Sequence, residues 1–139
     1  MTVLVDTCIW SLALRRRDGG KASGRDLGPA VESLRELILA GQASLIGPIR
    51  QELLSGLRRS EQFEALRGTL RAFETLEILP EDYERAAQHF NTCRGRGIQG
   101  SNTDFLICAV AERFRLPIFT TDRDFQHFAE HLPVELWAV

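Results

Sequence analysis

The 139-residue sequence is poor in cysteine and lysine and contains no long apolar run. Its three cysteines are Cys8, Cys93 and Cys108, and none of them stands in a C-x-x-C pair, which argues against a disulfide scaffold and a zinc ribbon. No segment approaches the roughly 20 apolar residues of a membrane span, and Met1 leads directly into a short strand-like segment. We therefore expect no signal peptide or membrane association, reduced thiols and a cytoplasmic location.

The length and apolar content suit one folded domain. Apolar residues make up 44% of the chain, and we expect residues 1–139 to form a single domain that needs no covalent cross-links. The 17 basic and 19 acidic side chains give a formal net charge of −2, which does not by itself indicate nucleic-acid binding. Lys21 is the only lysine, so the positive charge is almost all arginine, whose planar guanidinium suits phosphate groups.

Short apolar segments alternate with helical patterns along the chain, which predicts an α/β fold with a mainly parallel sheet. The expected strands and extended stretches are residues 2–5, 43–46, 76–79, 117–120 and 134–139. Helices are expected over residues 29–40, from Gly47 through Leu57, over 60–73, from Pro80, over 102–114 and over 122–131. In the helix from Pro80 we expect Tyr83, Ala87 and Phe90 to face inward. Residues 15–28 contain four glycines and predict a loop.

Four acidic residues fall where a parallel sheet places its ligands. Asp6 follows the first strand, Asp122 follows the strand at 117–120, and Glu52 lies early in the helix after the second strand. Asp104 lies in the first turn of the most apolar helix. Ligands of open parallel sheets bind beyond the carboxyl ends of the strands, so we expect the four carboxylates to meet at one edge.

Each acid also has an ordinary structural interpretation. Asp6 could belong to a turn after a strand, and Glu52 could occupy a solvated helix position. Asp104 and Asp122 could each cap the start of a helix. Neither Glu52 nor Asp104 has a basic residue three or four positions away, so pairing along the helix does not explain them. Four such acids at one edge favour a shared function over four separate structural roles.

Converging carboxylates raise one another's pKa unless a cation lies between them. Hard divalent ions with oxygen ligands are the natural counter-ions, so the pattern predicts one or two Mg²⁺ or Mn²⁺ ions. Such ions orient a water molecule for in-line hydrolysis of a phosphodiester. Without the four acids the net charge becomes +2, which is compatible with a polyanionic substrate.

Four ordered segments resemble the PIN-domain nucleases, in particular the VapC toxins of toxin–antitoxin pairs. The segments are VLVDTCIWSLALRR, QELLSG, GSNTDFLICAVA and PIFTTDRDF, and together they span nearly the whole chain. The resemblance implies a PIN-like α/β/α sandwich and Mg²⁺- or Mn²⁺-dependent endoribonuclease activity. It also implies a homodimer and a VapB-like antitoxin that inhibits the enzyme, with RNA as the substrate.

Carried over residue by residue, the resemblance places Asp6, Glu52, Asp104 and Asp122 in a catalytic metal site, with Asp124 as a further acid. Hydroxyl and amide side chains beside these ligands are Thr7, Asn102 and Thr120. Cys8 departs from the family, in which Asn or Ser is common at this position. Arginines in loops or at element ends are candidates for RNA contacts: Arg15, Arg16, Arg17, Arg94 and Arg96.

Competing interpretations remain for several features. The G-x-G-x-x-G match at residues 95–100 follows a helix rather than a strand, which argues against a nucleotide cofactor. His127 and His131 have the spacing of two zinc ligands but lack the HExxH context. A phosphatase-like fold with an aspartyl nucleophile normally needs a lysine near the phosphate. The alternative outside enzymes is a PIN module that binds metal, RNA or protein without catalysis.

Overall fold

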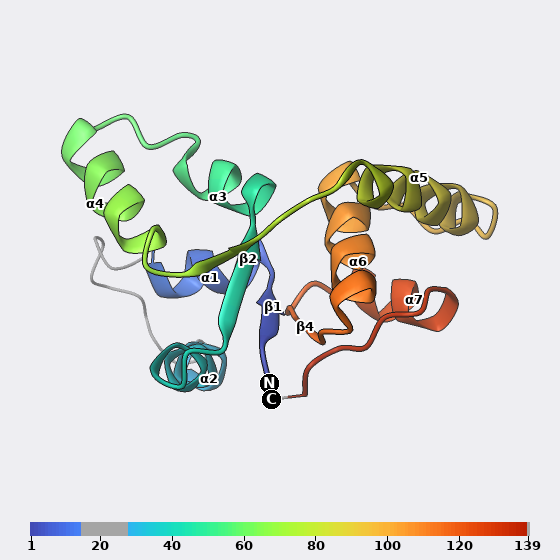
Figure 1. The fold of residues 1–139 in the computed structure, drawn as a ribbon, viewed down its shortest axis with the longest axis horizontal. Helices are drawn as coiled ribbons and strands as arrows, with labels where there is room; N and C mark the ends of the chain where they lie inside the picture. Colours follow the sequence, from blue (N-terminus) through green and yellow to red (C-terminus); the bar gives the residue numbers. More distant parts are fainter. Residues whose placement is uncertain (15–27, 139) are drawn as a thin grey trace.

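The computed structural model describes residues 1–14 and 28–138, which form a parallel sheet with helices on both sides (Figure 1). The strands are β1 (Val3–Val5), β2 (Ala43–Ile46), β3 (Glu74–Leu76) and β4 (Ile118–Phe119), in the order β3-β2-β1-β4. The helices are α1 (Thr7–Leu14), α2 (Gly28–Leu39), α3 (Gly47–Leu54), α4 (Ser60–Leu70), α5 (Pro80–Arg94), α6 (Asn102–Phe114) and α7 (Asp124–His131). The predicted α/β class and the α/β/α arrangement are confirmed.

The sheet is built on β1, whose neighbours are β2 and β4. Leu4 lies opposite Ser44 on one side and Ile118 on the other, and all three pairings are parallel. All three residues of β1 are buried, as expected of an apolar strand covered on both faces. The chain runs outward from β1 to β2 and β3, and then returns to the opposite side for β4. This reversal is the type of position at which open α/β sheets bind ligands.

Three elements differ from those predicted. Strand β3 lies at Glu74–Leu76, whereas the sequence predicted an extended stretch over residues 76–79. Helix α1 begins directly after Asp6, where the sequence indicated no helix, because an eight-residue apolar segment is too short to show a helical period. The predicted strand over 134–139 was wrong for the part that the structure describes, where Leu136 forms only an isolated bridge to Ile118. The neighbouring strand β4 has two residues, which leaves little edge for a longer pairing.

The buried face of α5 is also shifted from the predicted one. Tyr83 is 57% exposed and Ala87 is exposed, so the prediction that they face inward was wrong. The buried positions are Asp82, Ala86, His89 and Cys93. Two of these are polar, and they are tolerated inside because α6 supplies charged partners for them.

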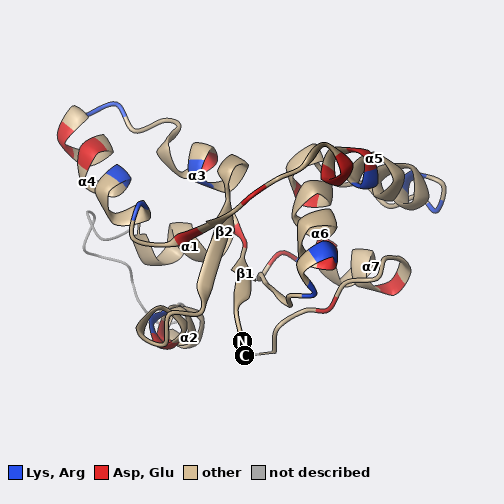
Figure 2. Cartoon of the chain, viewed as in Figure 1, with Lys and Arg blue, Asp and Glu red and all other residues tan. Residues whose placement is uncertain are grey.

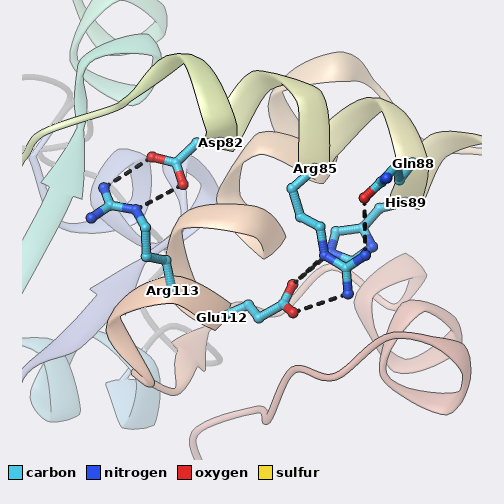
Figure 3. Close-up of polar contacts among 6 residues, drawn as sticks. All are labelled: Asp82, Arg85, Gln88, His89, Glu112 and Arg113. Carbon is cyan, nitrogen blue, oxygen red and sulfur yellow. Dashed lines mark hydrogen bonds and ion pairs between the residues drawn. The ribbon is translucent and has the colours of Figure 1, made fainter.

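Two groups of charged contacts join α5 to α6 (Figure 3). Arg113 donates to both carboxylate oxygens of Asp82, at 2.8 and 2.9 Å. Glu112 accepts two hydrogen bonds from Arg85 and lies 2.8 Å from Nε2 of His89. Burial acts to raise the pKa of Asp82, but the hydrogen bonds from Arg113 and the Leu79 amide outweigh it and the pKa is lowered. These contacts fix the orientation of α6 against α5.

Helix α6 lies in the interior and carries Asp104 at its start. Its buried run extends from Phe105 through Ala111, as the apolar sequence predicted. Ser101 caps the helix by accepting a hydrogen bond from the Asp104 amide at 3.0 Å. Within the described residues, no helix has the length and apolar character needed to cross a bilayer.

Gly100 precedes this cap at a position with no room for a side chain. A Cβ atom there would lie 2.6 Å from Cζ of Phe128 and 3.0 Å from the ring of Phe105. Both rings belong to the core, so neither can move without displacing other buried groups. The requirement for glycine is therefore one of packing.

Gly100→Ala is expected to destabilise the protein by about 1–3 kcal/mol, because the added methyl group overpacks the core. Gly68→Ala is the matched control, since Gly68 lies in α4 and a Cβ atom added there would meet nothing within 4 Å. Alanine there is expected to stabilise the helix by up to about 1 kcal/mol. Urea unfolding of both variants measures the two effects. Equal unfolding midpoints for Gly100→Ala and its parent would contradict the packing argument.

Candidate functional site

The four predicted acids come from four separate segments. Asp6 follows β1, Asp122 follows β4 after two threonines, and Glu52 lies on α3, which starts where β2 ends. Asp104 lies in the first turn of α6. Because β2, β1 and β4 are adjacent and parallel, their carboxyl ends lie at one edge of the sheet.

Asp6 is the buried member of the group, with 6% of its surface exposed. Its Oδ1 accepts the Thr7 amide at 2.7 Å, and its Oδ2 accepts the Thr120 hydroxyl at 2.8 Å. The Cys8 thiol also donates to Oδ2, at 3.5 Å. Backbone pairing holds the same residue, since its amide donates to the Phe119 carbonyl at 2.9 Å. The Asp6 carboxylate is therefore held in one place from several sides.

Threonines link the other acids to Asp6. The Thr7 hydroxyl donates to Oε1 of Glu52 at 2.8 Å, so the residue next to Asp6 also orients the exposed carboxylate of α3. Thr120 donates to Asp6 and at the same time accepts the Asp122 amide at 3.0 Å. The sequence prediction that Thr7 and Thr120 lie beside the acids agrees with these contacts.

Asp104 and Asp122 also have the local roles that the sequence left open. Oδ2 of Asp104 accepts the Ser101 amide at 3.0 Å, which completes a capping box at the start of α6. Oδ1 of Asp122 accepts the Asp124 amide at 2.9 Å, in the turn before α7. Each hydrogen bond leaves the carboxylate with further acceptor positions.

The carboxylates are close enough to repel one another. Burial raises the pKa of Asp6, and the charge of Asp122 raises it further, although hydrogen bonds from Thr120, Thr7 and Cys8 act in the opposite direction. Burial likewise raises the pKa of Asp104, with added repulsion from Asp6 and Asp122. Among the described residues, none of the four acids forms an ion pair. The structure thus brings Asp6, Asp104 and Asp122 into one electrostatic group, with Glu52 attached through Thr7.

This donor set suits a hard cation by its chemistry. Carboxylate oxygens are the ligands preferred by Mg²⁺ and Mn²⁺, and a positive charge here relieves the mutual repulsion of the acids. Within the described part of the chain, however, no three His, Cys, Asp or Glu side chains already stand together as metal ligands. One oxygen of each of Asp104, Asp122 and Glu52 accepts a hydrogen bond from the Ser101 amide, the Asp124 amide and the Thr7 hydroxyl, respectively.

Other predicted residues are less closely joined to this group. Asp124 is exposed at the start of α7 and contributes its amide to Asp122, while Asn102 lies exposed at the start of α6. Arg94 and Arg96 are exposed at and beyond the end of α5, the end that extends away from the sheet (Figures 1 and 2). Arg15, Arg16 and Arg17 lie outside the described residues.

Sequence reasoning missed two partners in this group. Thr121 lies 3.4 Å from the Cys8 sulfur through its hydroxyl, and Ser101 pairs with Asp104. The Ser101–Asp104 spacing is the signature of a capping box and was visible in the sequence. The contact between Cys8 and Thr121 joins residues 113 positions apart, and no local pattern indicates it.

A family model described as the PIN domain matches residues 3–131 of the chain. The chain belongs to the PIN domain family. The match includes all four acids and every strand of the sheet. It agrees with the predicted family, and no curated protein matches the chain significantly.

Solved structures share the PIN fold with this chain at low sequence identity. FitAcB from Neisseria gonorrhoeae has a TM-score of 0.74 and 21% identity, with 99% of this chain and 97% of that chain covered. VapBC2 from Rickettsia felis, bound to a DNA fragment from its promoter, has a TM-score of 0.69 and 16% identity. The match covers 99% of this chain and 100% of that chain. A toxin–antitoxin complex from Klebsiella pneumoniae has a TM-score of 0.64 and 22% identity. The match covers 89% of this chain and 90% of that chain.

The raised pKa values predict how the stability of the metal-free PIN domain depends on pH. A carboxyl whose pKa is higher in the folded state binds its proton more tightly there, so stability is lost as pH rises from about 3.8 through the raised pKa. Asp104→Asn removes this ionisation and retains an oxygen for the Ser101 amide. We expect the variant to unfold at a higher temperature than its parent at pH 7.

Thermal unfolding in EDTA from pH 4 to pH 8 checks this expectation. The difference between variant and parent is expected to be small at pH 4 and to grow toward neutral pH. Glu84→Gln, which removes an exposed acid of α5, is the control and is expected to show no such trend. A parent that is more stable than Asp104→Asn at pH 7 would mean that the capping charge outweighs the repulsion among the acids.

Proposed function

We propose that this PIN domain is a metal-dependent endoribonuclease and the toxin of a toxin–antitoxin pair. The observation that carries the proposal is the electrostatic group of Asp6, Asp104 and Asp122, drawn from three separate segments. Charges that destabilise one another are retained in proteins mainly where they serve a function, and a cation is the partner that relieves them. The fold similarity to toxin–antitoxin structures supports the biological role.

In this proposal Asp6 and Asp104 hold the principal Mg²⁺ or Mn²⁺ ion, and Glu52 and Asp122 complete the site. The same four carboxylates could also hold a second ion. When bound, the metal lowers the pKa of water and neutralises charge on the phosphodiester. The protein's part is to fix Asp6 through Thr7 and Thr120 and to direct the Glu52 carboxylate through Thr7. Thr120 also sets the spacing between Asp6 and the turn that carries Asp122.

The partners proposed are an RNA substrate, an antitoxin of the VapB type and a second copy of the chain. RNA is favoured by the arginine-rich positive charge, since guanidinium groups bind phosphate in a bidentate manner. The arginines at and after the end of α5 are exposed and, in the case of Arg94, rest over the Phe90 ring at 6.0 Å. They are proposed to contact the RNA backbone rather than the scissile bond.

Substitution of the central acid tests the proposed reaction. Asp6→Asn is expected to lower the rate of RNA cleavage in Mn²⁺ by about two orders of magnitude or more, because the buried ligand loses its charge. Cleavage of a structured RNA mixture is followed by sequencing the new ends, with the parent and Glu84→Gln compared side by side. Circular dichroism establishes that each variant is folded.

EDTA is expected to stop cleavage by the parent, and added Mn²⁺ is expected to restore it. Full activity of Asp6→Asn, or activity that persists in EDTA, would overturn the proposal. Binding of Mn²⁺ without cleavage of any RNA would favour the alternative, a PIN module that binds metal, RNA or protein without catalysis.

A further inference from the structure

A hollow between α5 and α6, here called the α5–α6 pocket, is not used by the site described above. The two helices lie side by side and both line it (Figure 1). Its volume is about 460 Å³, within the roughly 300–1,000 Å³ of pockets that bind small molecules. Asn102 and Thr103 line the pocket and directly precede Asp104 in the first turn of α6. The pocket therefore adjoins the group of carboxylates.

The pocket has an aromatic floor and an uncharged polar rim. Phe90 is partly buried and Phe105 fully buried, and their rings meet edge to face with centroids 5.7 Å apart. Tyr83, Asn91 and Asn102 stand exposed around the opening. Among the described residues that line the pocket, none is charged. A neutral, planar ligand therefore suits it better than a phosphate group or an acidic peptide.

The polar groups of the rim are available to a ligand. Within the described part of the chain, the side chains of Tyr83, Asn91 and Asn102 have no hydrogen-bond partner. A side-chain amide presents a donor and an acceptor in one plane, and the edges of nucleobases carry donors and acceptors in the same way. Aromatic side chains supply faces on which unpaired bases stack. The rim thus offers both kinds of contact by which proteins hold an unpaired base.

The hollow continues toward a cation at the end of α5. A second hollow of about 250 Å³ shares Phe90 and Phe105 with the first and is lined by Arg94. The guanidinium of Arg94 is exposed and lies 6.0 Å from the centre of the Phe90 ring. The two hollows therefore lie in sequence along α5, with uncharged groups in the first and a phosphate-binding cation in the second. This order matches the alternation of base and phosphate along a single strand.

We propose that the α5–α6 pocket binds one unpaired base of the RNA substrate, next to the phosphodiester at the metal site. Tyr83 stacks on the base, the amides of Asn91 and Asn102 bind its edge, and Arg94 contacts a neighbouring phosphate. A paired base would have to leave its stack to enter, so single-stranded RNA is the preferred substrate. The assignment to RNA rests on the proposed nuclease function, whereas binding of a free nucleoside by the pocket does not.

The four ribonucleosides are the probes for the pocket itself, because they carry a base and no phosphate and need no metal. Tyr83 is the only tyrosine of the chain, so its ring resonances are identified in protein labelled on tyrosine alone. At least one nucleoside, added to the metal-free full-length protein, is expected to shift these resonances saturably by NMR. Ribose 5-phosphate, which lacks the base, is expected to leave them unchanged. Asn102→Ala is expected to weaken the nucleoside affinity about 2–10-fold, because one amide is lost.

Tyr83→Leu tests the same pocket in RNA cleavage, because leucine keeps apolar bulk and removes the stacking ring. In Mn²⁺, its KM for a single-stranded RNA is expected to rise about 5–100-fold, with a much smaller change in kcat. Phe114→Leu is the matched control, since Phe114 is an exposed ring at the end of α6 outside the pocket, and its KM is expected to equal that of the parent. Ala87→Phe fills the pocket from an exposed position and gives the same comparison if Tyr83→Leu fails to fold, as judged by circular dichroism.

Tyr83 resonances that respond to no nucleoside would overturn the proposal, and so would a KM unchanged in both Tyr83→Leu and Ala87→Phe. Light scattering tests the competing occupant, a second copy of the chain. A parent dimer that Tyr83→Leu converts to monomers, without nucleoside binding by the parent, would assign this face to the dimer and also overturn the proposal.

These results are distinguishable from failure of the nuclease proposal. If a nucleoside binds at Tyr83 but no RNA is cleaved in any metal, the nuclease proposal fails and the pocket remains a site for a base. If RNA is cleaved but no nucleoside binds, the nuclease proposal stands and the assignment of the pocket is rejected.

Discussion

The burial of the Asp6 carboxylate is the constraint on which the rest of the site depends. A charged group taken out of water is unfavourable unless hydrogen bonds or opposite charges offset the loss of hydration. Here the Thr7 amide, the Thr120 hydroxyl and the Cys8 thiol supply hydrogen bonds, and no described cation pairs with the group. The carboxylate is thus well oriented but only partly compensated, and its pKa is raised by burial and by the charge of Asp122.

The scaffold around this group is held by contacts that lie elsewhere. Asp82 and Glu112 are charged too, but each is paired with arginine, and their pKa values are lowered rather than raised. These ion pairs join α5 to α6 (Figure 3), and α6 is the helix that carries Asp104. The molecule therefore contains two kinds of wholly or partly buried acid. The acids paired with arginine join the two helices, whereas Asp6, Asp104 and Asp122 at the sheet edge act on one another through their charges.

The sequence predicted the strand at 43–46 and the helix at 102–114 with correct limits, because both are apolar and bounded by strong signals. It also predicted the edge at which Asp6 and Asp122 meet, since strand order constrains where strand ends lie. The sequence did not indicate helix α1, because eight residues are too few to show a helical period of apolar positions. It also predicted the wrong buried face for α5. There, burial of Asp82 depends on Arg113, which lies 31 positions away in the sequence. A period of apolar residues carries no information on such long-range pairs.

The hydrogen bonds of the acids differ in how firmly they hold each carboxylate, and this difference bears on the proposed metal site. Asp6 is held by donors from its own segment and from the segment after β4, so its position follows from the sheet. Glu52 is exposed and held by one side-chain hydroxyl, and such a bond contributes only about 1 kcal/mol. Rotation of Glu52 toward a cation therefore requires little free energy compared with any movement of Asp6. In the proposed metal site, coordination would therefore start from the fixed carboxylate at the end of β1, and the exposed carboxylate of Glu52 would turn toward the ion.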